Sequence, residues 1–234
     1  MIESLYGKTF VILGSQLAVT WLTTLLLIGL FRWLHRAKVS WVTGQTNKDG
    51  QTNLDFDRET VKPYFLLILV GNFASFIALY LFGIDDLAIG IPLFTVWSVL
   101  TGLMVGFSLL AVDENLGGKV LGLTALIIFA AALIGTQTGI DFTFLDHGLS
   151  IALYLLIAAG LLRLFLSING WVQRMMALSG IVVFTGYLLL DFYRLSQMSG
   201  DLKANNWQSA MVLAINLYLD IINLFLDLLD WMSG

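Results

Sequence analysis

Cysteine is absent from the 234 residues, and histidine occurs only twice, as His35 and His147. The absence of cysteine excludes disulfides, thiolate nucleophiles and thiolate metal sites, and two histidines leave little for a histidine-based zinc site. Charge is scarce too: 12% of the residues are charged, against about 25% in an average soluble domain. The net charge is −4 and no basic face is visible. Nucleic acid is therefore not an expected partner.

Long apolar runs dominate instead, because 58% of the residues are hydrophobic. A transmembrane helix needs about 20 mainly apolar residues. The 2 prolines and 22 glycines suit closely packed transmembrane helices. The sequence therefore predicts an all-α polytopic membrane protein in a lipid bilayer, a single domain over residues 1–234. Its seven predicted spans are 9–34, 62–83, 87–111, 119–140, 147–168, 171–194 and 207–231.

Two features bear on how the chain enters the membrane. The first apolar run is too long for a signal-peptide core and lacks a small-x-small cleavage site, so we expect it to be retained. The joint 36–61 is rich in Gly, Thr, Asn and Asp, which predicts a solvated loop. Nine of the 12 Lys and Arg residues fall on the side of this loop, six of them in or beside it. The positive-inside rule then places the loop in the cytoplasm and the N-terminus outside.

The last span contains a polar stripe within the segment "INLYLDIINLFLDLLDW". Its members are spaced by 4, 3, 4 and 3 residues, which puts them on one helix face: Asn216, Asp220, Asn223, Asp227 and Asp230. A carboxylate in hydrocarbon costs several kcal/mol, so we expect this face to line the bundle interior or a water-filled cavity. Asp220 lies near mid-membrane. Asp227 and Asp230 lie near the helix end, where they either reach interfacial water or form an acidic funnel at a pore mouth.

Asp191 is the only acid in the long apolar part of the preceding span. The short turn between the two spans makes them antiparallel neighbours, and this brings Asp191 near the depth of Asp220. Two carboxyl groups that meet in a low dielectric cannot both ionise cheaply, so such a pair is expected to share a proton. The alternative is that Asp191 pairs with Arg194, one turn further along the same helix. The spacing alone leaves both open.

The segments "GYLLLDFYRL" (186–195) and "LYLDIINLF" (217–225) resemble the signature of the Bax inhibitor family of transmembrane proteins. The resemblance is specific over residues 171–231 and weaker over 94–168. Over the first 90 residues, only the number of spans agrees with the family. It implies seven helices with the last one central in the bundle. For bacterial-type members it implies a pH-sensitive calcium leak channel, in which two hydrogen-bonded aspartates gate the pore. By motif, these gating and pH-sensing aspartates are Asp191 and Asp220, which would also bind calcium weakly and transiently.

Three departures from the family pattern matter. An acidic residue that the family has in the second helix is absent, since "LVGNFASFIAL" offers only Asn72. Bacterial channel members carry an arginine near the end of the second helix that can pair with the two aspartates, whereas "LYLFGIDDLAIG" offers only Asp85 and Asp86. Arg194 and Arg163 are the candidates to replace it, and Asn216, Asn223 and Asp227 are candidates for pore support. Family members also have a cytoplasmic N-terminus, opposite to the charge count. Orientation therefore stays open.

The leading expectation is a passive, pH-sensitive calcium leak in a bacterial inner (plasma) membrane. Deprotonation of the aspartate pair should favour opening, and no cofactor is expected besides calcium as the permeant ion. The alternative is a non-transporting accessory subunit that binds another membrane protein complex, such as a membrane protease. An enzyme is not expected. An intramembrane aspartyl protease needs two such carboxylates, but it also has a Gly-x-Gly-Asp context that "YLDI" and "LLDF" lack.

Overall fold

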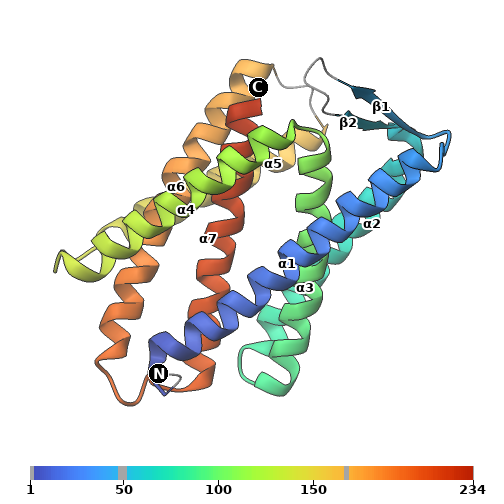
Figure 1. Ribbon diagram of the computed structural model, residues 1–234. Helices are drawn as coiled ribbons and strands as arrows, with labels where there is room; N and C mark the ends of the chain where they lie inside the picture. The colour runs from blue at the N-terminus through green and yellow to red at the C-terminus, as the bar shows by residue number, and fades with distance from the viewer. Residues whose placement is uncertain (1–2, 47–51, 166–168, 234) are drawn as a thin grey trace. The chain divides into compact units, whose positions relative to one another are not determined.

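The computed structural model describes residues 3–46, 52–165 and 169–233. Within them, seven α-helices are long and apolar enough to cross a membrane, which confirms the predicted all-α membrane fold (Figure 1). The helices are α1 (Leu5–Arg36), α2 (Arg58–Ala78), α3 (Leu87–Leu110), α4 (Glu114–Gln137), α5 (Leu145–Phe165), α6 (Gly170–Ser199) and α7 (Trp207–Ser233). One π-helical turn, η1 (Leu79–Gly83), extends α2.

Local signals explain where the helices begin and end. Asp86 caps α3 by accepting a hydrogen bond from the Ala88 N–H at 2.8 Å. Asn169 caps α6 in the same way, accepting from the Trp171 N–H at 3.2 Å. After α4, Gly139 adopts a left-handed backbone with φ 66°, which suits glycine. The helix ends at Gln137, three residues before the predicted end of that span.

The segment 36–61 was predicted to be a solvated loop, and here the prediction was incomplete. It contains an antiparallel hairpin of β1 (Val42–Thr46) and β2 (Thr52–Phe56), with Val42 paired to Phe56 and Thr46 to Thr52. The two strands lie beside the ends of α1 and α2 (Figure 1). Each strand begins with a β-branched residue, a type that favours strands. The high content of Gly, Asn and Asp in this segment predicted a loop and so concealed the two strands.

The chain forms two compact units. One comprises Val11–Glu114 and contains most of α1 together with α2 and α3. In it, α1 and α3 approach closely: the Thr20 hydroxyl donates to the Ser98 carbonyl at 3.2 Å and the Thr24 hydroxyl to the Gly102 carbonyl at 2.8 Å. Small residues and hydroxyl groups at such a contact are typical of helix pairs in membranes.

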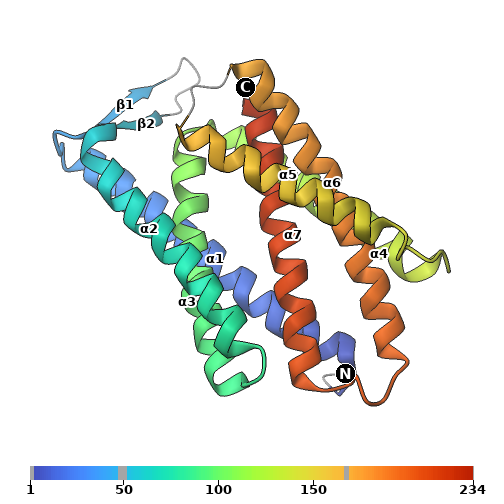
Figure 2. The same cartoon turned by 180° about the vertical axis from the view of Figure 1, so that it is seen from behind.

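The other unit comprises Met1–Phe10 and Asn115–Gly234. Its α6 and α7 run side by side in both views, and α5 crosses α6 (Figure 2). The helix α7 is the most buried of the seven. In its most apolar 18-residue segment 61% of the residues are buried, against 0% in that of α5. The buried residues of α7 are mainly apolar, and of the polar stripe only Asp220 is buried, the other four members being half-buried. The single seven-helix domain and the central position of α7 stay predictions.

Candidate functional site

Asp191 on α6 and Asp220 on α7 are buried, with 2% and 5% of their surfaces exposed. No other acidic side chain that the structure describes is buried to this degree. The two carboxyl groups face each other within reach of a hydrogen bond. Oδ2 of Asp220 has no hydrogen-bond donor among the described residues. Since ionised carboxylates only accept hydrogen bonds, a bond between them requires a proton on one of them.

Asp191 also contacts Arg194, one turn further along α6. Nη1 of Arg194 donates to Oδ1 of Asp191 at 3.2 Å. The contact with Arg194, one of the two alternatives that the sequence left open, is therefore present, and Asp220 lies near the same carboxyl group of Asp191. A proton shared between the two aspartates stays a prediction. Arg194 thus contacts one of the two aspartates, and its role as a substitute for the missing second-helix arginine stays a prediction. Arg163 is the other candidate; it belongs to the last part of α5, and its side chain lies outside the described residues.

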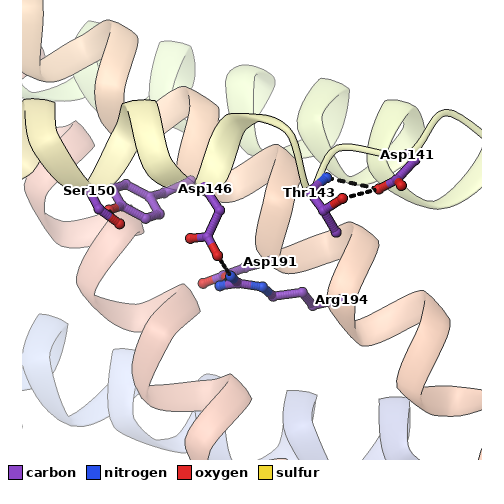
Figure 3. A network of polar contacts seen from close by, with 7 residues as sticks. Asp141, Thr143, Asp146, Ser150, Asp191 and Arg194 are labelled. Carbon is purple, nitrogen blue, oxygen red and sulfur yellow. Dashed lines mark hydrogen bonds and ion pairs between the residues drawn. The ribbon is translucent and has the colours of Figure 1, made fainter.

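A third carboxylate, from α5, completes this cluster. Nη2 of Arg194 lies 2.9 Å from Oδ2 of Asp146, so the guanidinium group stands between Asp146 and Asp191 (Figure 3). Tyr187, one turn before Asp191, donates from its hydroxyl group to Oγ of Ser150 on α5 at 3.4 Å. Sequence reasoning missed Asp146, because its partner lies 48 residues further along the chain and on another helix. The only local signal is an acid in the first turn of a helix.

The remaining stripe residues of α7 lie at other levels of the helix. Asn216 is half-buried, and Asn223 donates to the Leu219 carbonyl of its own helix at 2.9 Å. The carboxylate of Asp227 lies against Gly180 of α6, where a Cβ would fall 2.0 Å from Oδ2. Asp230 accepts a hydrogen bond from the side-chain amide of Gln173, also on α6. Asp227 and Asp230 are therefore both in contact with α6.

Acidic residues outside the spans have local roles. Asp141, in the joint before α5, accepts from the hydroxyl group of Thr143 at 2.7 Å and from its N–H at 2.9 Å. These bonds hold the pKa of Asp141 below its ordinary value of 3.8.

Within the described part of the chain, no group of three or more His, Cys, Asp or Glu residues is placed to hold a metal ion. Any calcium at the Asp191–Asp220 pair would need further oxygen ligands from carbonyl groups or water.

Comparison with known proteins gives one family and several relatives. The sequence model of the family described as inhibitor of apoptosis-promoting Bax1 matches residues 3–234. An uncharacterized membrane protein of Streptococcus pyogenes serotype M6 is 29% identical over 142 residues, 59% of this chain and 61% of the relative. The uncharacterized protein YrjE of Lactococcus lactis is 26% identical over 82% of this chain and 81% of its own length. A Golgi anti-apoptotic protein of vaccinia virus (strain Lister) is 36% identical over 46% of this chain and 43% of its own length. The chain thus spans about three fifths of the length of the streptococcal relative.

Proposed function

The chain belongs to the Bax inhibitor family of membrane proteins, and we propose that it is a pH-sensitive calcium leak channel gated by Asp191 and Asp220. One observation carries the proposal. Two buried carboxyl groups on neighbouring helices face each other, and Oδ2 of Asp220 lacks a donor. A proton shared between them would tie α6 to α7. We place this channel in a bacterial inner membrane as part of the same proposal.

The gate would respond to the charge of the pair. With one shared proton, the two groups attract each other through a hydrogen bond and carry a single negative charge. Loss of that proton leaves two like charges in a low dielectric, where their repulsion is far stronger than in water. Repulsion pushes α6 and α7 apart at this level and increases the attraction for a cation. Rising pH should therefore open the path.

Calcium suits the proposed path as a transient ligand. It takes six to eight oxygen ligands, of which the pair supplies at most four, so carbonyl groups and water would supply the rest. Conduction requires binding that is weak enough to be reversed quickly. Asn216, Asn223 and Asp227 would support the path along α7, since they share one face with Asp220.

Calcium flux into dye-loaded proteoliposomes between pH 5 and pH 8 tests the proposal. The wild-type protein should leak calcium faster as pH rises, whereas Asp191→Asn and Asp220→Asn should each lose this dependence. Asp141→Asn is the matched control, because Asp141 is an exposed acid outside the spans whose hydrogen bonds are with Thr143 and Tyr193; it should behave as the wild type. A wild-type rate equal to that of empty liposomes at every pH would refute the channel, as would unchanged pH dependence in both pair variants.

A non-transporting accessory subunit is the second candidate. The absence of an arginine near the end of the second span favours this candidate, and Asp86, which follows that span, caps α3. Such a subunit needs a stable helix bundle and a recognition surface, but no ion path. Purification from a native membrane distinguishes the two. A stoichiometric membrane-protein partner together with absent calcium flux would favour the subunit, and flux from a purified monomer would favour the channel.

A further inference from the structure

Arg194 divides its guanidinium group between two helices. Nη2 lies 2.9 Å from Oδ2 of Asp146 on α5, and Nη1 lies 3.2 Å from Oδ1 of Asp191 on its own helix. Figure 3 shows the planar group between the two carboxylates. Because the nitrogens of arginine form a rigid fork, the contact on one side determines where the other side points. The position of the Asp146 carboxylate therefore influences how Nη1 of Arg194 is oriented toward Asp191.

Asp146 is suited to hold this group in place. It lies in the first turn of α5, where unpaired N–H groups and the helix dipole favour a negative charge. Its side chain is 42% exposed, whereas that of Asp191 is 3% exposed. Asp146 is thus the more solvated of the two carboxylate partners of Arg194, and it makes the shorter contact.

Two further contacts fix the start of α5 against α6. A Cβ on Gly186 would fall 2.7 Å from the side chain of Leu149, so the two helices approach closely at that level. The hydroxyl group of Tyr187 reaches Oγ of Ser150 at 3.4 Å. Asp146 precedes Leu149 and Ser150 by about one turn of helix. Its distance from Arg194 is therefore set by packing as well as by charge.

We propose that Asp146 is a positioning residue for the Asp191–Asp220 pair, because it shares Arg194 with Asp191 and fixes the orientation of the guanidinium group. This inference deepens the proposed function, since it adds a residue to the same site, and it ties α5 to a pair that lies on α6 and α7. The other groups that face the cluster are Tyr187 from α6 and Asp220 from α7.

Sharing of one cation has a measurable consequence. Removal of either carboxylate leaves Arg194 with the other partner. Removal of both leaves a guanidinium group that is only 35% exposed without a carboxylate among these partners, and an uncompensated, partly buried charge is strongly destabilising. The effects of Asp146→Asn and Asp191→Asn on thermal stability should therefore not add, because the two acids share Arg194 as a partner.

The experiment is a set of melting temperatures of the full chain in detergent, at one pH, for Asp146→Asn, Asp191→Asn and the double variant. The same variants are then measured with Arg194→Gln. With Arg194 present, the double variant should melt at least about 2 °C below the additive expectation. With Arg194→Gln, the effects should add. Asp146→Glu should keep the wild-type behaviour with Asp191→Asn, and Asp141→Asn, the control, should show no coupling. Additive effects with Arg194 present, or equal coupling without it, would overturn the inference.

Chemical modification of Arg194 gives a second readout that does not need Asp191 variants. Phenylglyoxal modifies exposed guanidinium groups, and peptide mass spectrometry reads the rate at Arg194 alone. Asp146→Asn should raise that rate several-fold, and Asp146→Glu should restore the slow rate. An unchanged rate in Asp146→Asn would overturn the inference. Neither readout depends on calcium flux, so the role of Asp146 and the channel can fail separately.

Discussion

The carboxylate of Asp227 occupies the place of the side chain that Gly180 lacks. A Cβ on Gly180 would fall 2.0 Å from Oδ2 of Asp227 and 2.6 Å from its Cγ. These atoms belong to the end of a rotatable side chain, so a larger residue would push the carboxylate aside without separating the helices. The small residue on α6 and the acid on α7 are thus matched to each other.

Gly180→Ala should therefore destabilise the protein by about 1 kcal/mol, the lower end of the cost of overpacking. The cost should disappear in an Asp227→Ala background, because the smaller side chain leaves room for the methyl group. Gly122→Ala in α4 is the control, since a Cβ there meets nothing within 4 Å. Thermal unfolding of the four variants measures this. An equal cost with and without Asp227 would contradict the steric explanation.

Gly102 in α3 differs from Gly180, because a Cβ on Gly102 would meet backbone atoms of α1, which cannot rotate away. A Cβ there would fall 2.5 Å from the Thr20 carbonyl oxygen of α1. To make room, α1 and α3 must separate, which lengthens the hydrogen bonds that Thr20 and Thr24 donate to α3. We expect Gly102→Ala to cost about 3 kcal/mol or more in unfolding free energy. Gly14→Ala on α1, where the Cβ meets nothing within 4 Å, should be harmless. Similar melting temperatures for both variants would show that the close contact is absent.

Asp141 provides a pH-dependent contribution to stability outside the spans. Its pKa is held below the ordinary 3.8 mainly by the hydrogen bonds from Thr143. A carboxyl group whose pKa is lowered on folding stabilises the folded state above its unfolded pKa and loses this contribution as pH falls through its folded pKa. The effect should be small because the group is fully exposed. Melting temperatures of wild type and Asp141→Asn should differ by a constant amount above about pH 5 and converge below pH 3.8. A difference that grows as pH falls would have the wrong sign.

The sequence predicted much of the fold because its signals are local. Runs of apolar residues gave the seven spans, and the 3.6-residue period placed Asp220 and Asp227 on one face of α7. The ends of the helices were less predictable, since Asn169 and Gly139 act through capping and backbone conformation and not through hydropathy. The paired strands at 42–46 and 52–56 were hidden by their polar composition.

The site was predictable only where its residues belong to one helix or one recognisable motif. Asp191 and Arg194 are one turn apart, so their contact could be proposed from spacing. Asp146 reaches the same guanidinium group from another helix, and no periodicity connects it to Arg194. The match of Gly180 to Asp227 likewise depends on how α6 and α7 are aligned. Contacts of this kind follow from packing of the helices against each other, which composition and spacing do not determine.

The central claim is that Asp191 and Asp220 share a proton, and infrared difference spectroscopy of the reconstituted protein between pH 5 and pH 8 tests it most directly. Exposed carboxyl groups are ionised throughout this range, so a protonated carboxyl band that fades as pH rises reports a protected group. The account predicts such a band in the wild type, its loss in Asp220→Asn, and its persistence in the control Asp141→Asn. No pH-dependent carboxyl band in the wild type, or the same band in Asp220→Asn, would contradict the shared proton.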